Sequence, residues 1–172
     1  EDEQFSMTYE QLCDLSFKMP LSFELYDFVL DTDISDGTTS YFSKKTGQDL
    51  TNSVKNSLEL DVVGILRPKK NTTSSSISGA VGYLPSLTEY IINEINNPSN
   101  SEYDNIFTNV VMYQKLNPLV NAFTGKIYNP LDQNEVLEAI TMYSSNLKAL
   151  GVRDLEDPSS IYIYPKDFVA KE

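Results

Sequence analysis

The chain has 172 residues, with 25 acidic against 13 basic side chains, no histidine, no tryptophan and one cysteine. Without histidine, Ser-His-Asp triads, Cys-His protease pairs and histidine-containing zinc sites are excluded, and one cysteine forms neither an internal disulfide nor a cysteine-based metal cluster. The net charge of −12, most of it within residues 1–36, opposes contact with phosphate backbones, so no nucleic-acid partner is expected.

Length and an apolar content of 40% predict one compact unit, residues 1–172. The apolar run at residues 62–66 is far shorter than the ~20 residues that span a bilayer. The chain opens Glu-Asp-Glu, without an initiator methionine or a secretory signal. We therefore expect a fragment excised from a longer protein.

The N-terminal segment predicts a short helix followed by a strand. Thr8 and Gln11 form a capping box, which favours a helix over residues 9–15. Cys13 lies on the apolar side of this helix and is expected to be a buried small hydrophobe, because no nearby cation would activate its thiol. Apolar and polar residues then alternate from 17 to 21, which is typical of a half-buried strand.

The middle of the chain predicts a helix, a strand, a loop and a second helix. Residues 49–57 fit a short helix. Residues 58–66 begin in strict apolar-polar alternation and end fully apolar, which makes them the clearest predicted strand. The polar stretch 69–79 is too poor in apolar groups to pack. An apolar stripe over 86–96, opened by a capping box at Ser86, predicts the second helix.

Two more helices and a strand are predicted in the C-terminal half. One helix runs from 106 to 116, and a clearer one begins after Asp132 and ends before Gly151, a residue suited to the position after a last turn. Residues 161–164 alternate as a closing strand. Strands and helices without strict alternation predict an α+β fold with a mixed sheet. The apolar face of the clearer helix is expected to consist of Val136, Ile140, Tyr143, Leu147 and Leu150.

A run of acidic residues is the candidate metal site. Asp31, Asp33 and Asp36 place three carboxylates within one turn-rich loop, which could hold a hard cation through oxygen ligands. The spacing departs from that of a calcium loop, and the twelfth position counted from Asp31 is Phe42 rather than glutamate. A solvated acidic loop is therefore the favoured interpretation.

A basic cluster and an aromatic strand face are the candidate partner or substrate surface. Arg67, Lys69 and Lys70 follow the clearest strand, where an anion could bind, although such clusters more often belong to solvated loops. Tyr162 and Tyr164 alternate with isoleucines, so one strand face is aromatic and suits either core packing or a partner. No pair of carboxylates stands out as hydrolase residues. The sequence thus predicts no catalytic residue and no cofactor site.

Two segments resemble a transporter family. Residues 60–66 (Leu-Asp-Val-Val-Gly-Ile-Leu), a Ser-rich loop and residues 81–88 (Val-Gly-Tyr-Leu-Pro-Ser-Leu-Thr) are similar to the MacB-like periplasmic core domain of FtsX/MacB-type ABC transporter permeases. The closing residues 160–172 also resemble the family, in which a strand and then a helix follow. The opening residues 12–26 and the segments 123–125 and 147–151 resemble its Gram-positive version. On this resemblance, residues 97–159 form a helical insertion where a partner could dock.

The resemblance implies an α+β domain between the first and second transmembrane helices of a permease, at the cell membrane on the extracellular side. It implies no enzyme activity and no cofactor here, because ATP is hydrolysed on a separate cytoplasmic subunit. The implied partners are that ATP-binding subunit, a second permease copy and an extracellular adaptor or peptide. The implied function is coupling of ATP hydrolysis to export or handling of a peptide-like or amphipathic substrate. A freestanding cell-surface module that binds protein or glycan without transport is the alternative.

Overall fold

The computed structural model describes residues 6–33, 35–67 and 81–156. These residues form an α+β structure with five α-helices, two 3₁₀-helices and two antiparallel sheets of two strands each. The predicted α+β class is confirmed, but in this part of the chain two separate ribbons stand in place of one mixed sheet. The loop predicted at 69–79 and the strand predicted at 161–164 lie outside the described residues.

The first ribbon pairs β1 (Ser16–Met19) with β4 (Leu58–Asp61). Lys18 lies opposite Glu59, and their side chains form an ion pair of 2.8 Å. Burial along β4 alternates as predicted, with half-buried leucines and exposed acids. After a last bond from the Val62 amide to the Leu15 carbonyl, residues 63–67 leave the ladder, so β4 ends before the predicted limit at residue 66. An apolar run continues a strand only where a neighbouring strand takes up its backbone groups.

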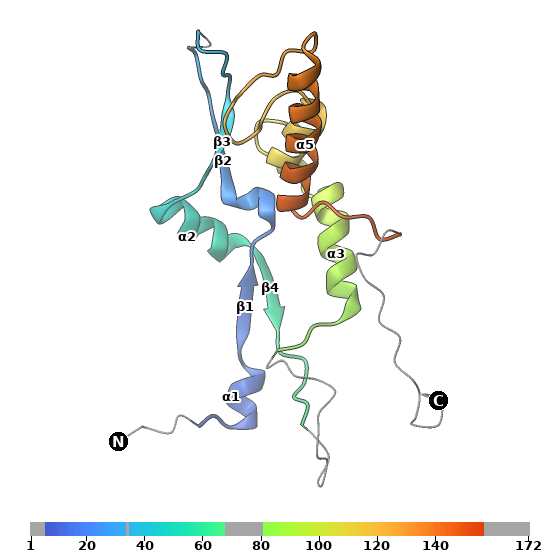
Figure 1. Ribbon diagram of the computed structural model, residues 1–172. Helices are drawn as coiled ribbons and strands as arrows, with labels where there is room; N and C mark the ends of the chain where they lie inside the picture. Colours follow the sequence, from blue (N-terminus) through green and yellow to red (C-terminus); the bar gives the residue numbers. More distant parts are fainter. Residues whose placement is uncertain (1–5, 34, 68–80, 157–172) are drawn as a thin grey trace, which may run out of the picture.

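α1 (Tyr9–Cys13) precedes this ribbon. The predicted capping box forms, with the Thr8 amide donating to Gln11 Oε1 at 2.9 Å and the Gln11 amide donating to Thr8 Oγ1 at 3.2 Å. The helix buries none of its residues and Cys13 is exposed. The prediction of a buried cysteine is therefore wrong, because α1 projects from the end of the ribbon and meets no core (Figure 1).

The second ribbon is built from consecutive segments. A 3₁₀-helix, η1 (Ser22–Leu25), leads into β2 (Tyr26–Val29), which pairs with β3 (Tyr41–Lys44) so that Phe28 lies opposite Phe42. The acidic loop, residues 30–40, joins the two strands. α2 (Gly47–Asn56) follows β3 and returns the chain to β4, in the place where a helix over 49–57 was predicted.

Local sequence determines where two further helices begin. α3 (Pro85–Asn96) starts with proline at its first position, which suits a residue without an amide hydrogen, so the predicted cap at Ser86 is wrong. α4 (Val110–Leu116) starts after Asn109, whose side chain accepts hydrogen bonds from the amides of the first turn. That cap makes α4 shorter than the predicted helix over 106–116. Between them lies a short 3₁₀-helix, η2 (Ser101–Tyr103).

α5 (Gln133–Ala149) is the longest helix of the described residues. Asp132 caps its first turn and Gly151 adopts a φ of 83° after its last turn, as predicted. Of the predicted stripe, Leu150 is buried and Val136, Tyr143 and Leu147 are half-buried, whereas Ile140 is 58% exposed. The helix also buries Ala139, Met142 and Asn146, and the Asn146 amide is hydrogen-bonded to Gln114 on α4.

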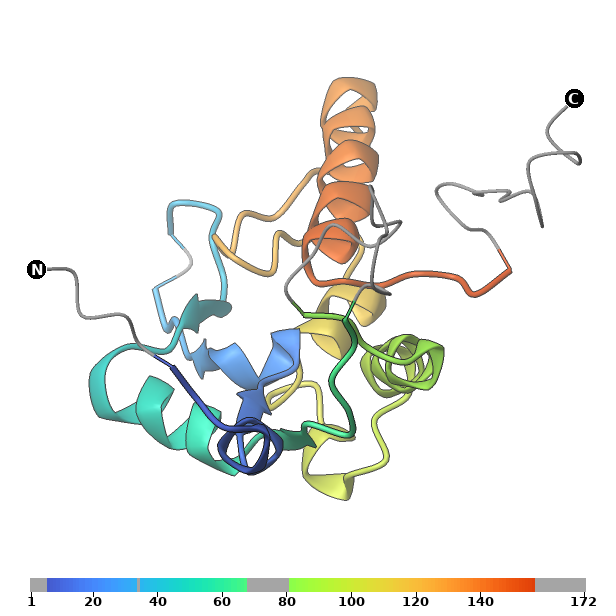
Figure 2. The same cartoon turned by 90° about the horizontal axis from the view of Figure 1, so that it is seen from below.

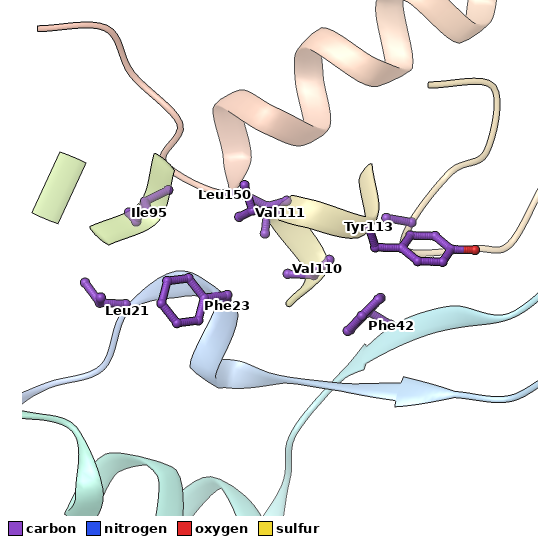
Figure 3. Packing of buried hydrophobic residues seen from close by; sticks show 9 residues of the cluster. Leu21, Phe23, Phe42, Ile95, Val110, Val111, Tyr113 and Leu150 are labelled. Atoms are coloured by element: carbon purple, nitrogen blue, oxygen red, sulfur yellow. The ribbon is translucent and has the colours of Figure 1, made fainter. Parts of the chain in front are cut away.

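One main hydrophobic core joins the second ribbon to the helices (Figure 3). Figure 3 shows side chains from η1, β3, α3, α4 and the end of α5 converging on one another. Because α4 and α5 pack on the ribbon, the helical region within 97–159 shares this core with the N-terminal half. The buried members are Leu21, Phe23, Phe42, Ile95, Val110, Val111, Tyr113, Ala122 and Leu150.

The molecule is elongated around this core (Figure 1). The β1–β4 ribbon and α1 extend from the core toward one end, and α5 together with the acidic loop extends toward the other. Viewed from the α1 end, α1 lies in front of the ribbon, with α2 and α3 to either side (Figure 2). In Figure 1, residues 62–67 continue from β4 toward the α1 end, and residues 81–84 lead from near the tip of β4 to the start of α3.

Candidate functional site

The residues predicted as a partner or substrate surface are only partly described. Arg67 is exposed and follows β4. Lys69, Lys70, Tyr162 and Tyr164 lie outside the described residues. The structure thus places one of the five, near the α1 end of the molecule.

The acidic loop turns its carboxylates onto its own backbone. Asp31 Oδ1 accepts from the Asp33 amide at 2.9 Å, Asp33 Oδ1 from the Ser35 amide at 3.1 Å, and Asp36 Oδ1 from the Thr38 amide at 3.0 Å. Hydrogen bonds from the side chain and backbone of Ser35 hold the pKa of Asp33 below its ordinary value, and Thr38 does the same for Asp36. Among the described residues no three acidic or cysteine side chains converge as metal ligands. The loop is a series of Asx turns in which the carboxylates act as turn acceptors.

A polar cleft of about 460 Å³ lies between η1 and β2, α2, and the η2 segment. Three asparagines and a serine supply neutral polar groups to its wall. The hollow is large enough for a small ligand or a side chain of a partner, although it is more polar than most ligand pockets. Its charged and aromatic lining residues are Glu24, Asp27, Lys45, Asp49, Glu102 and Tyr103.

Local structure fixes the two central groups of this polar cleft. Glu24 occupies the third position of η1, and its carboxylate accepts from the Leu21 amide at 2.6 Å. Lys45 follows β3, where its amide donates to the Leu25 carbonyl at 2.9 Å. From there its ammonium donates to Ser53 Oγ on α2 at 3.0 Å and lies 3.6 Å from Asp27 Oδ1. The lysine thus connects the second ribbon to α2 across the cleft.

The polar cleft carries negative potential. Burial raises the pKa of Glu24, and this outweighs the opposing effects of the Leu21 amide and of the Lys45 charge. Burial, followed by the charges of Glu24 and Glu102, raises the pKa of Tyr103. With Asp27 and Asp49 the lining holds four carboxylates against one ammonium. The arrangement therefore favours a cationic group, or a ligand rich in hydroxyls, over an anion.

Sequence reasoning missed the polar cleft because its lining comes from four separate segments that meet only in the fold. One local signal was present, since Glu24 follows Leu21 by the three residues that place a carboxylate over a helix start. That signal indicates a cap and does not indicate a ligand. The contact of Lys45 with α2 depends on how α2 packs and has no counterpart in local sequence.

A second candidate surface is apolar and lies at the α1 end (Figure 1). Val63 and Leu66 are each 85% exposed, and Val81 is 79% exposed. Where exposed apolar side chains form a contiguous patch, they mark a site where another molecule or membrane packs. We call this set of residues the apolar end. It comprises six residues from segments 62–66 and 81–84, one from α1 and one from β1: Val63, Ile65, Leu66, Val81, Tyr83, Leu84, Tyr9 and Phe17.

A more open apolar hollow of about 510 Å³ lies beside α5. Leu137, which is 64% exposed, lines it together with Thr141, Met142 and Ser145. Tyr128 closes one side, and the Lys126 ammonium lies 4.3 Å from the centre of its ring. This hollow belongs to the helical region 97–159, in which a partner site was expected.

Comparisons with known proteins gave no match: no protein-family model matches the chain, and neither a curated protein nor a solved structure is similar to it. Within the ranges that the structure describes, none of the helices has the length and apolar character needed to cross a bilayer.

Proposed function

We propose that the chain is the extracellular domain of an FtsX/MacB-type ABC transporter permease, with a MacB-like fold. It is non-enzymatic and holds no cofactor. It couples ATP hydrolysis on a separate cytoplasmic subunit to the export or handling of a peptide-like or amphipathic substrate. Its partners are that ATP-binding subunit, a second permease copy and an extracellular adaptor or peptide, and it stands outside the cell membrane.

The apolar end is the observation that carries this proposal. Both segments that resemble the permease family, 60–66 and 81–88, contribute exposed apolar side chains to this end of the molecule. α1, the first described helix, lies at the same end (Figure 1). A domain that continues into membrane helices needs such a surface, because apolar groups are stabilised when another apolar body covers them.

The packing supports a mechanical role. The main core joins η1 and β3 to α3, α4 and the end of α5, so these elements move together. The Lys45 contacts add α2 to the same body. Motion of the membrane helices at the apolar end would reach the α5 end as a displacement of this body, provided that substrate contacts differ between two states.

The polar cleft favours a second candidate function, a cell-surface module that binds protein or glycan without transport. Its carboxylates, its amides and Tyr103 line a concave, mostly polar surface of the size of a small ligand. In that case the apolar end would contact another part of the cell surface. Titration with oligosaccharides, followed through the amide signals of residues 100–103 and α2, would detect such binding.

The complete coding sequence distinguishes the two candidates. A permease predicts one apolar segment of about 20 residues before the domain and three after it. A surface module predicts at most one such segment. Absence of the four segments would refute the permease proposal, whatever the domain binds.

A further inference from the structure

The β1–β4 ribbon offers a strand edge that the described residues leave open. Val62 donates its amide to the Leu15 carbonyl at 3.4 Å, which extends the antiparallel register by one hydrogen-bonded pair. Such pairs alternate along an antiparallel ladder, so Phe17–Leu60 is also hydrogen-bonded and Ser16–Asp61 is not. The backbone amides and carbonyls of residues 59 and 61 therefore point away from β1. None of the other described residues is hydrogen-bonded to them.

The two faces of the ribbon have opposite character. Side chains alternate across a strand, so Phe17, Leu58 and Leu60 share one face and Lys18, Glu59 and Asp61 share the other. Phe17 is 49% exposed, and the two leucines are half-buried. A strand added beside β4 would therefore meet apolar side chains on one face and carboxylates on the other.

The charges along the outer edge of β4 favour one kind of partner strand. Lys18 neutralises Glu59 through their 2.8 Å ion pair, while Asp61 lies opposite Ser16 and has no cationic partner among the described residues. An acidic edge repels a second copy of itself, which is a known means of preventing edge-to-edge pairing. A strand with basic side chains on that face would turn the same charges into cross-strand attraction.

We propose that the outer edge of β4 binds an extended cationic peptide, in which basic and apolar residues alternate, by antiparallel strand addition. The peptide backbone pairs with Glu59 and Asp61, its basic side chains lie over their carboxylates, and its apolar side chains extend the face of Leu58 and Leu60. The link to transport rests on the proposed function, whose substrate class this binding specifies. The binding itself is a property of the 172-residue chain and is measured on it.

The test uses a capped hexapeptide of alternating lysine and valine, titrated into the full 172-residue chain by calorimetry at two salt concentrations. Saturable binding that weakens at higher salt is expected, with slowed hydrogen exchange of the amides of Glu59 and Asp61. A peptide of the same composition in two blocks, three lysines and then three valines, should bind at least about tenfold more weakly because its faces mismatch.

Matched variants locate the binding edge. Asp61→Pro removes an outward amide hydrogen of β4 without removing a ladder bond, and should weaken binding about tenfold. Ser16→Pro makes the same change on the opposite edge of the ribbon and should leave binding unchanged. Asp61→Asn keeps the backbone amide and removes the charge. It should weaken peptide binding by about two- to fivefold, and it tests the edge even if the proline variant folds poorly.

Four outcomes would overturn the proposal. One is no saturable binding by the native chain, and another is equal weakening by Ser16→Pro and Asp61→Pro. Binding that requires deletion of residues 157–172 would show that the chain's own C-terminal segment occupies the edge. A dimer in sedimentation that Asp61→Pro dissociates would show that a second copy does. None of these outcomes bears on the membrane topology, which the coding sequence tests separately.

Discussion

Replacing Gln114 with methionine tests how the helical region is joined to the rest of the core. This side chain is fully buried and uses all its hydrogen-bonding capacity. Nε2 donates to the carbonyls of Val120 at 2.9 Å and Asn117 at 3.1 Å, and Oε1 accepts from the Ala122 amide at 3.1 Å and Asn146 Nδ2 at 2.8 Å. Methionine fills a similar volume, so the change removes polar pairing and leaves little cavity. The Val120 carbonyl and the Ala122 amide lose their partner, whereas the Asn117 carbonyl keeps the Val120 amide and Asn146 Nδ2 keeps Asn121 Oδ1. With about 1 kcal/mol for each of the two groups left unpaired, the free energy of unfolding should fall by about 2 kcal/mol.

Urea unfolding followed by circular dichroism measures this loss. Gln48→Met is the matched control, because Gln48 is exposed on α2 and bonds only to Asn52 among the described residues, at 2.9 Å; it should change the free energy of unfolding by less than about 0.5 kcal/mol. Adding Asn146→Leu to Gln114→Met should cost less than the sum of the single changes, since each single change already removes the hydrogen bond between Asn146 Nδ2 and Gln114 Oε1. A loss below about 1 kcal/mol for Gln114→Met, at unchanged denaturant slope, would refute the argument that this network joins α4 to α5.

Three further predictions concern the turns, pH and the acidic loop. Gly125→Ala should lower the free energy of unfolding, measured by thermal melts, by more than about 2 kcal/mol. Gly125 has a φ of 72°, and a Cβ there would lie 2.1 Å from the Thr39 carbonyl oxygen. Gly37 has a φ of 79° but open space around it, so Gly37→Ala should cost only about half as much in the same melts. Burial raises the pKa of Glu24 above its ordinary 4.5, so its contribution to stability is complete below that pH and is lost as pH rises through the folded-state pKa. Glu24→Gln should therefore be more favourable, relative to the native chain, in melts at pH 7 than at pH 4, and a difference independent of pH would contradict this. Calcium at millimolar concentration should leave the melting temperature unchanged, because the acidic loop, residues 30–40, uses its carboxylates within its own turns; a calcium-dependent rise would show that they bind the ion.

Local signals in the sequence predicted the helices well. The capping box of Thr8 and Gln11, the cap at Asp132 and the glycine at 151 all occupy their predicted positions. These signals depend on hydrogen bonds between residues a few positions apart, which neighbouring sequence determines. The α+β class follows from the same local patterns.

Features that depend on distant contacts were not predictable in this way. Cys13 is exposed because α1 has no core beside it, and its apolar neighbours in sequence do not show this. The buried face of α5 includes Asn146, which a hydrophobic pattern assigns to solvent; only the amide network with Gln114 makes that burial favourable.

The candidate sites differ in the same respect. The acidic loop was visible as a motif, but whether its carboxylates face one another or their own backbone depends on loop conformation. The polar cleft brings Glu24 and Lys45 together with α2 and η2, and no spacing along the chain indicates that meeting. β4 and β1 correspond to the strands predicted over 58–66 and 17–21, but no local pattern indicates that the two pair.

Labelling of Cys13 in intact cells tests the proposed extracellular location most directly. Cys13 is the one cysteine of the chain and is exposed on α1. The full-length protein, with any cysteine outside these residues replaced, is treated with a membrane-impermeant maleimide; a Cys13→Ser variant and a cysteine on the cytoplasmic ATP-binding subunit serve as controls. An extracellular domain predicts that Cys13 is labelled before lysis and the cytoplasmic cysteine only afterwards. Labelling of Cys13 only after lysis would contradict the proposal.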